Sequence, residues 1–458
     1  MIKGQTIELQ ITDLNNLGNG VGRYDGQVVF VRGAVSGDVV RASVIKVNKS
    51  FAVARLVDII TPSPDRMSEE FCTAPLSCGG CVYRHITYES ELELKRGYVK
   101  AEFLKAGLSE VNVLPVLSTG RVSGYRNKAQ YPIAKGKNGT YAGFFASKTH
   151  NVIPAEQCSI QADEFAPILR FVCEFADNHG WSVYDEESGR GLLRHVYLRV
   201  GEKTGQIMLC LVINGDALPR ENEFVSAVRE RFDKIVSIVI NQNKENTNVV
   251  LGKKYRTLYG KEGIEDELCG LKFFISPASF YQVNRDGAEL LYNKAAELAA
   301  LRGDEVLMDL YCGTGTIGLS MAKKAKVLCG IEIVESAVEC AKENAARNQI
   351  DNARFICADA GDKDVILAAA GGTRPDVVII DPPRKGSTKE LVECLADLCV
   401  PKIVYVSCGP DTLARDCAWF RESGYEIGEV QPVDMFPRTG HVESVVCLTR
   451  RLDVDMRR

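Results

Sequence analysis

Short apolar and β-branched runs, broken by turns rich in Gly, Asn and Asp, fill the first sixty residues of the chain. Runs this short and closely spaced predict four or five strands rather than helices. Closing the strands into a barrel leaves no exposed edge, so we expect a small OB-like β-barrel over residues 1–60. The clearest runs are Thr6–Gln10, Val28–Arg32, Val39–Val47 and Phe51–Ile60.

A different pattern begins at about Leu271, where apolar runs alternate with longer stretches of helical composition. This alternation predicts a doubly wound, parallel α/β sheet of the Rossmann-like kind over residues 271–458. Two further runs predict a hairpin that completes the sheet. The predicted strands are Glu305–Leu310, Val327–Ile333, Arg354–Asp359, Asp376–Asp381 and Ile403–Cys408, and the hairpin strands are Tyr425–Val433 and Val442–Arg450.

Between these two parts, residues 70–270 mix strand and helix patterns and predict a central α+β domain. The stretch Glu89–Gly107 has helical composition with a glycine stop, and we expect this helix to pack on the C-terminal domain. The run Arg194–Asn214 predicts two strands joined by a polar turn, and Arg199 within it is assigned a structural role. Further strands are predicted at Val236–Gln242 and Val249–Leu251.

The composition of the 458-residue chain is that of an ordinary globular protein. Its formal net charge of -4 provides no overall basic field for binding nucleic acid. No apolar run approaches the ~18 residues of a membrane-spanning helix, and no secretory signal leads the chain. We therefore expect a cytoplasmic protein without membrane contact, and no pattern predicts an obligate protein partner.

Sixteen cysteines would be unusual as a disulfide set in a cytoplasmic protein, so metal binding, catalysis and burial must share them. Cys72, Cys78 and Cys81 lie close together, and two glycines before the third let the backbone fold tightly. Cys158, in a polar turn, is the best candidate for a fourth thiolate. Three clustered cysteines plus one distant cysteine favour an iron–sulfur cluster, with zinc as the second candidate.

The stretch from Arg84 to His150 is locally basic, with eleven Lys and Arg residues against five Glu residues. Aromatic residues are interleaved with these charges. Basic side chains pair with phosphates and aromatic rings stack on unpaired bases, so this stretch predicts RNA binding. The segment with the most specific pattern is Gly-Tyr-Arg-Asn-Lys, in which polar side chains lie beside an aromatic residue. Its candidate RNA contacts are Tyr125, Arg126 and Lys128.

The first strand of the C-terminal half is followed by a Gly-x-Gly-x-x-Gly fingerprint beginning at Gly313. Glu332, nineteen residues later, ends the second strand, where a carboxylate can bind ribose hydroxyls. Both features fit S-adenosylmethionine and a nicotinamide dinucleotide equally well. Asp359 is placed to hold an adenine, and Asp381 opens an Asp-Pro-Pro-Arg turn. Such a turn resembles those of base-modifying methyltransferases and favours S-adenosylmethionine.

Cys408 follows the fifth predicted strand and precedes a Gly-Pro stop, so its thiol should lie at the same sheet edge as Asp381. A lone cysteine is more often a buried structural residue. Two motifs at one ligand-binding edge instead favour a nucleophile, since thiolate is accessible near neutral pH. Arg384, which ends the Asp-Pro-Pro-Arg turn, is a candidate to stabilise negative charge on the substrate.

In combination, these motifs resemble the RNA (uracil-5-)-methyltransferase family, in the branch that acts on bacterial 23S ribosomal RNA. The resemblance runs the whole length of the chain and includes the TRAM barrel that is appended to RNA-modifying enzymes. It is carried by Gly18–Arg23, Gly33–Asp38, the cysteine segment Cys72–Cys81, Gly124–Lys128, Ser279–Asn284, Tyr311–Thr316, Asp381–Arg384, Ser407–Pro410 and Thr439–Glu443.

The resemblance also implies roles for single residues. S-adenosylmethionine is the expected methyl donor, and a 4Fe-4S cluster is the expected metal group. Cys408 matches the nucleophile and Glu443 the general base. Thr316 departs from members that place Asn there, which leaves one cofactor contact in doubt. The matching cofactor-binding residues are Gln282, Tyr311, Glu332 and Asp381, and the matching cluster ligands are Cys72, Cys78, Cys81 and Cys158.

Carbon 5 of uracil is a poor nucleophile until a thiolate adds to carbon 6, so a cysteine and a base explain the chemistry. Three alternatives remain open at this point. The first is the same chemistry on transfer RNA, which differs only in the substrate. The second is a dinucleotide-dependent iron–sulfur oxidoreductase, which would leave the Asp-Pro-Pro-Arg and Ser-Cys-Gly-Pro segments without a role. A non-catalytic RNA-binding protein is the third.

Overall fold

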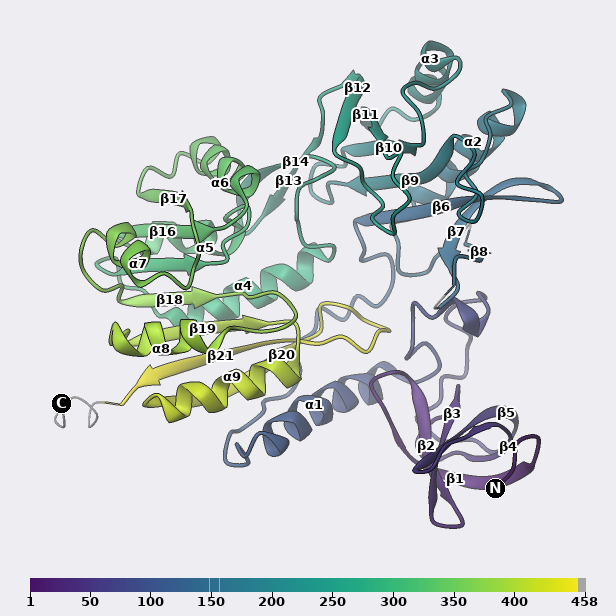
Figure 1. The fold of residues 1–458 in the computed structure, drawn as a ribbon, viewed down its shortest axis with the longest axis horizontal. Coiled ribbons are helices and arrows are strands. Elements are labelled where there is room, and N and C mark those ends of the chain that lie inside the picture. The colour runs from purple at the N-terminus through teal and green to yellow at the C-terminus, as the bar shows by residue number, and fades with distance from the viewer. Residues whose placement is uncertain (148, 156, 452–458) are drawn as a thin grey trace.

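A computed structural model describes residues 1–147, 149–155 and 157–451 of the chain; the last residues of the predicted 271–458 domain lie outside this part. In these residues, a closed barrel, two seven-stranded sheets and a separate two-stranded hairpin make up the β structure. The barrel, the central sheet and the C-terminal sheet form three distinct bodies (Figure 1). No helix within the described residues is long and apolar enough to cross a membrane.

The predicted barrel is confirmed, and it closes in the order β1-β2-β3-β5-β4. Alternate side chains of its strands point inward, which produces a small apolar core. One strand, β2, was not predicted separately because its glycine-rich sequence resembles a turn. The strands are β1 (Thr6–Leu14), β2 (Asn19–Tyr24), β3 (Gln27–Arg32), β4 (Val39–Val47) and β5 (Phe51–Thr61).

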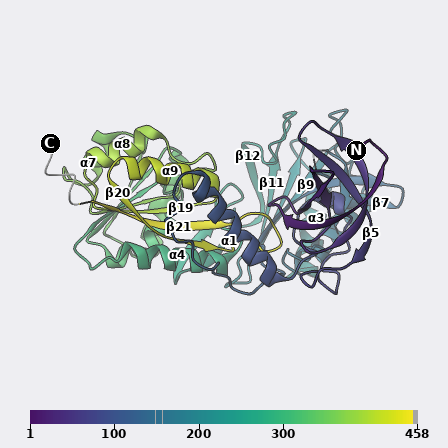
Figure 2. The ribbon, with the colours of Figure 1, turned by 90° about the horizontal axis from the view of Figure 1, so that it is seen from below.

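A loop containing the 3-10 turn η1 (Leu76–Cys78) leads from the barrel to helix α1 (Tyr88–Lys105). Thr87 caps this helix by accepting a hydrogen bond from the Ser90 amide. Val99 and Phe103 of α1 are buried in the core of the C-terminal sheet. Helix α1 therefore runs from the barrel side of the molecule onto the C-terminal domain (Figures 1 and 2).

The central sheet has the order β12-β11-β10-β9-β6-β7-β8, and two helices cover one of its faces. The predicted strand at Val249–Leu251 is wrong. Those residues form a loop whose Val249 and Val250 carbonyls accept hydrogen bonds from the Asn243 side chain. The elements are β6 (Lys128–Gly136), β7 (Gly139–Phe145), β8 (Val152–Pro154), α2 (Phe165–Asn178), β9 (Leu193–Val200), β10 (Ile207–Ile213), α3 (Glu221–Arg231), β11 (Ile235–Gln242) and β12 (Lys254–Gly260).

The C-terminal sheet follows the hairpin of β13 (Ile264–Leu268) and β14 (Leu271–Ile275). Its strands are β15 (Val306–Leu310), β16 (Val327–Glu332), β17 (Ala353–Cys357), β18 (Val377–Ile380), β19 (Lys402–Ser407), β20 (Tyr425–Val433) and β21 (Glu443–Arg450). They are ordered β17-β16-β15-β18-β19-β21-β20, with β21 antiparallel to β19. The predicted doubly wound sheet with a terminal hairpin is confirmed.

Helices cover both faces of this sheet, as a buried parallel sheet requires. One face packs against α4 (Arg285–Ala299), α5 (Thr316–Met321) and α6 (Glu335–Arg347). The other packs against α7 (Lys363–Ala369), α8 (Lys389–Asp397), α9 (Pro410–Glu422) and α1. A short 3-10 turn, η2 (Ala322–Lys324), follows α5. The strand order reverses between β15 and β18, so a ligand-binding crevice is expected at their carboxyl ends.

Candidate active site

The chain leaves β15 in a constrained conformation at the switch point of the sheet. Tyr311 directly follows this strand and has a left-handed backbone with φ of 62°. A non-glycine residue in this region costs about 1–2 kcal/mol. Such strain persists where the surrounding structure enforces it, and it occurs often at binding sites.

Glu332 connects the second strand to the glycine loop. Its carboxylate accepts hydrogen bonds from the Gly313 amide at 3.1 Å and from the Val334 amide at 2.9 Å. Ile333 beside it is 70% exposed, and this apolar surface next to a fixed carboxylate suits a nucleoside. Sequence reasoning missed Ile333 because an apolar residue at a strand end is usually buried. Asp359 is exposed after β17, and its carboxylate accepts a hydrogen bond from the Gly361 amide.

The segment that carries Gln282 is held by the central sheet. Arg199 is fully buried and donates to the Tyr281 carbonyl at 2.6 Å and to the Ser279 carbonyl at 3.2 Å. Asn127 donates from its side chain to the Gln282 carbonyl at 3.0 Å. Gln282 is therefore placed by a domain other than the one that carries the glycine loop.

Two aspartates lie beneath the switch point in low-dielectric surroundings. Burial raises the pKa of Asp381 to about 7. Burial also raises the pKa of Asp309 to about 7, although this side chain accepts a hydrogen bond from the Gly318 amide at 2.9 Å. Sequence reasoning missed Asp309, which lies inside an apolar strand and supports the third glycine of the fingerprint.

Cys408 lies between the end of β19 and the first turn of α9, with Gly409 as the N-cap. Burial is the main cause that raises the pKa of its thiol to about 11. The carboxylates of Glu443 and Asp381 raise the pKa further, while the Arg384 guanidinium lowers it. The thiol therefore lies within electrostatic range of these three predicted site residues.

Glu443 is the first residue of β21 and pairs with Val433 of β20. Its side chain is buried, and burial followed by the charge of Asp381 raises its pKa to about 8. Arg384 acts in the opposite direction. A carboxyl group with a pKa near the working pH can accept a proton and return it, which is what a general base requires.

Cys408 faces a cavity of about 410 Å³ that is lined by the barrel, the cysteine segment, Tyr98 of α1 and the C-terminal domain. Asn16 and Leu17 come from the barrel, and Gly79 and Gly80 come from the cysteine segment. Leu17 is 66% exposed and also borders the neighbouring cysteine cavity. Sequence reasoning missed Leu17, although a single large apolar residue in the polar turn Asn15–Asn19 was a usable signal. From the C-terminal domain the cavity is lined by Arg384, Cys408, Gly409, Pro410, Asp411, Thr439, Gly440, His441 and Val442.

The four predicted cluster cysteines, Cys72, Cys78, Cys81 and Cys158, all line one cavity of about 210 Å³. The pKa of Cys81 is raised to about 12, first by burial and then by the other three thiols. Among the described residues, however, no group of three or more His, Cys, Asp or Glu side chains is arranged to hold a metal ion. Within the described residues, the four thiols thus share one cavity without forming a metal site, for zinc or for an iron–sulfur cluster.

The three candidate RNA contacts in the Gly-Tyr-Arg-Asn-Lys segment differ in their surroundings. The Tyr125 ring is fully buried, and its hydroxyl donates to the Pro437 carbonyl at 2.9 Å. A base therefore has no exposed face of this ring to stack on in this structure. Arg126 is half-buried at the cysteine cavity, with its guanidinium 5.6 Å from the Phe436 ring centroid. Lys128 is half-buried, and burial lowers its pKa to about 8.

Comparison with known proteins matches two family models to this chain. The model of tRNA (uracil-5-)-methyltransferases matches residues 87–451, and the TRAM domain model matches residues 2–57. The second match coincides with the closed barrel. The first includes Cys158, the glycine loop and the C-terminal residues that line the Cys408 cavity.

Relatives match over almost the full length. An uncharacterized RNA methyltransferase of Clostridium tetani is 44% identical over 98% of this chain and 97% of its own. An uncharacterized RNA methyltransferase of Bacillus cereus is 42% identical over 98% of this chain and 97% of its own. The crystal structure of Pyrococcus abyssi tRNA (uracil-54, C5)-methyltransferase with S-adenosyl-L-homocysteine has a TM-score of 0.79 and 30% identity, covering 97% of this chain and 100% of that chain. The oxidoreductase and non-catalytic alternatives are therefore excluded. The chain belongs to the tRNA (uracil-5-)-methyltransferase family and is an S-adenosylmethionine-dependent RNA (uracil-5-)-methyltransferase with a TRAM domain.

Proposed function

We propose that this enzyme methylates carbon 5 of a specific uridine in 23S ribosomal RNA in the cytoplasm, through a covalent bond to Cys408. One observation carries the chemistry: the Cys408 thiol faces a cavity at the sheet edge and lies within electrostatic range of the Glu443 carboxylate. In this proposal, residues 1–60 and 70–270 hold the RNA and residues 271–458 carry out the transfer.

The methyl donor is S-adenosylmethionine, which supplies the methyl group and a positive charge on its sulfonium. Glu332 is proposed to bind the ribose hydroxyls, since its carboxylate is already oriented by the Gly313 amide. Asp359 and the exposed Ile333 flank the same strand ends and are proposed to hold the adenine. The remaining proposed donor-binding residues, which lie around the glycine loop, are Gln282, Tyr311, Gly313 and Asp381.

The covalent step begins when the Cys408 thiol releases its proton to solvent, which the Arg384 guanidinium favours, and the resulting thiolate bonds to carbon 6 of uracil. Electrons of the carbon 5–carbon 6 double bond move to oxygen 4 and give an enolate. Carbon 5 of this enolate then takes the methyl group, while the electrons of the broken sulfur–methyl bond stay on the sulfur of the donor, which leaves as a neutral thioether. Glu443 then removes the proton from carbon 5. The electrons of that broken bond restore the double bond and expel the sulfur of Cys408 as thiolate. Arg384 lowers the pKa of both Cys408 and Glu443, and we propose that it also faces the enolate.

The target base must leave any stack to reach Cys408. The cavity wall supplied by the barrel and by the cysteine segment supports an extruded base rather than a duplex. Arg126 and Lys128 are proposed to attract the backbone next to this cavity, because phosphates are recognised by basic groups. Tyr125 supports the neighbouring loop from below through its hydrogen bond to Pro437.

We further propose that Cys72, Cys78, Cys81 and Cys158 hold a 4Fe-4S cluster that supports the RNA-binding wall. The supporting observation is that all four thiols line one cavity beside Leu17 and Arg126. Methyl transfer needs no redox step, so the cluster would order the segment between the barrel and α1.

We expect Cys158→Ser to lose iron and sulfide, to weaken RNA binding and to lower the melting temperature, with S-adenosylmethionine affinity within about twofold of wild type. Iron and sulfide analysis, calorimetry and RNA titration measure these effects. Cys399→Ser, a cysteine in the C-terminal domain, is the matched control and should keep its metal. Loss of metal with unchanged melting and RNA affinity would contradict the supporting role.

Ribosomal RNA is proposed as substrate on the resemblance to the ribosomal branch. Transfer RNA is the second candidate, since the Pyrococcus abyssi relative is described as acting on uridine 54 of tRNA. Mapping 5-methyluridine in both RNA classes from cells lacking this protein decides between them. We expect one ribosomal position to lose its methyl group and to regain it on complementation, with tRNA unchanged. Loss confined to tRNA would replace the substrate while leaving the chemistry intact.

A further inference from the structure

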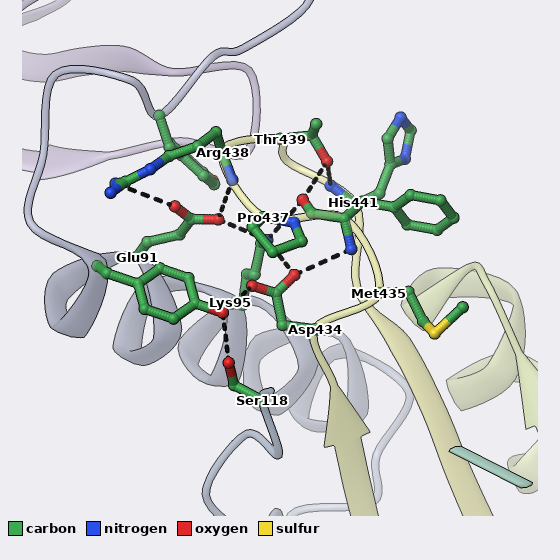
Figure 3. Close-up of polar contacts among 12 residues, drawn as sticks. Glu91, Lys95, Ser118, Asp434, Met435, Pro437, Arg438, Thr439 and His441 are labelled. Atoms are coloured by element: carbon green, nitrogen blue, oxygen red, sulfur yellow. Dashed lines mark hydrogen bonds and ion pairs between the residues drawn. The ribbon is translucent and has the colours of Figure 1, made fainter. Parts of the chain in front are cut away.

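The loop from Asp434 to Val442 joins β20 to β21 (Figure 3), and Glu443 follows this loop as the first residue of β21. Its ends are fixed by the pairing of Val433 with Glu443. Hairpin connections usually have two to five residues, so this longer loop depends on contacts from outside its own hairpin. The source of those contacts decides what controls the position of the general base.

Four consecutive carbonyl groups of this loop accept hydrogen bonds from four different segments of the chain. The donors come from the start of α4, from α1, from the central domain and from the segment after the cysteines. The bonds are Asn284 Nδ2 to Met435 O at 3.0 Å, Lys95 Nζ to Phe436 O at 3.1 Å, Tyr125 OH to Pro437 O at 2.9 Å and Tyr83 N to Arg438 O at 3.0 Å.

A buried ion network fixes the same loop to α1 (Figure 3). Lys95 Nζ lies 2.7 Å from Glu91 Oε1 and 2.7 Å from Asp434 Oδ1, and all three side chains are almost completely buried. Glu91 Oε1 also accepts the Arg438 amide at 2.7 Å, and the Tyr88 hydroxyl donates to Asp434 Oδ2 at 2.7 Å. Directional, charge-assisted bonds thus hold both the beginning and the middle of the loop.

Such a network is a costly way to gain stability alone. Burying charges carries a desolvation penalty, and well-packed apolar residues often stabilise a fold equally well or better. Charged groups differ in that they fix one geometry, because every donor and acceptor has a direction. The barrel adds a last restraint, since a Cβ atom on Gly440 would clash with the Asn16 carbonyl oxygen.

We propose that Glu91 and Lys95 are positioning residues for proton removal, which hold the 434–442 loop so that Glu443 reaches the carbon 5 proton. The loop takes this position only when the barrel, the cysteine segment and the central domain are all seated against it. The proposal rests on the proposed role of Glu443 as the general base.

The test is Glu91→Gln in the full-length enzyme, because glutamine keeps the volume and an oxygen acceptor for the Arg438 amide. We expect the rate of the first methyl transfer to stay within about threefold of the wild-type rate. Breakdown of the protein–RNA adduct should slow about tenfold, as the loss of one charge-assisted hydrogen bond implies. Rapid-quench kinetics and denaturing gels measure the two steps separately. Glu93→Gln, an exposed acid on the same helix, is the matched control and should behave as wild type.

A merely structural role would lower both steps in proportion to the folded fraction, with no adduct, and that result would overturn the proposal. If Glu91→Gln does not fold, Tyr88→Phe removes one bond to Asp434 with little change of volume. In Tyr88→Phe, adduct breakdown should slow about threefold while the first methyl transfer stays close to the wild-type rate. An unchanged adduct lifetime would again overturn the proposal. If Glu443→Gln itself forms no adduct, the assignment of the general base fails instead, so the two failures are distinguishable.

Discussion

Replacing Cys408 with alanine is expected to lower methyl transfer to RNA by about 10⁴-fold or more, since it removes the proposed nucleophile. The thiol belongs to the loop between β19 and α9 and not to the glycine loop, so binding of S-adenosylmethionine should change by less than about twofold. Transfer of a radiolabelled methyl group and calorimetric titration of the donor measure the two effects.

The matched control for this variant is Cys447→Ala. Cys447 is a half-buried cysteine in β21 of the same sheet, but it pairs with Val404 and lies away from the carboxyl edge of β19. It should retain turnover close to wild type. Substantial methylation by Cys408→Ala would remove the covalent mechanism altogether.

Replacing Glu443 with glutamine is expected to trap the protein–RNA adduct. Methyl transfer precedes proton removal, so a single turnover should still methylate the base while multiple turnover falls about 10²–10⁴-fold, the usual contribution of a general base. The first step should not slow, because the Glu443 carboxylate raises the pKa of Cys408 and its removal favours the thiolate. Denaturing gels of enzyme with labelled RNA detect the adduct.

The same variant has a signature in its pH dependence. Burial raises the pKa of Glu443 to about 8, so the carboxyl group is mostly protonated below that pH and cannot accept the carbon 5 proton. In the wild type, the rate of adduct breakdown should therefore rise with pH up to about 8 and then level off. In Glu443→Gln, this pH-dependent rise should be absent. Glu426→Gln, an exposed acid on β20, is the matched control. A freely turning-over Glu443→Gln enzyme would refute the role of this residue.

The sequence predicted the C-terminal sheet and its reacting edge well, because each strand there is a short apolar run followed by a chemically distinctive turn. Cys408 and Asp381 could be placed at one edge from strand order alone. Strand β12 was not predicted because it is a polar edge strand, and the strand predicted at the nearby apolar run Val249–Leu251 is a loop that Asn243 fixes. Apolar periodicity cannot distinguish these two cases.

Other parts of the site had no local signal. The Lys95–Asp434 ion pair joins residues more than 300 positions apart, and both lie in stretches where charged residues usually face solvent. Tyr125 lies among basic residues and suggested an RNA-stacking ring, yet its side chain is fully buried and its hydroxyl donates to the Pro437 carbonyl. Burial of this kind depends on how domains pack against one another, which the residues of one segment do not reveal.

The close contact at Gly440 limits how this enzyme can be re-engineered. The barrel's Asn16 carbonyl occupies the space that any side chain at position 440 would need, so the two surfaces must be exchanged together. We expect a chimaera that receives a foreign barrel with a bulkier tip to keep its cofactor pocket but to lose the alignment of Glu443, the proposed general base. Replacing the barrel to retarget the enzyme to another RNA therefore requires replacing the barrel tip around Asn16 together with the loop around Gly440.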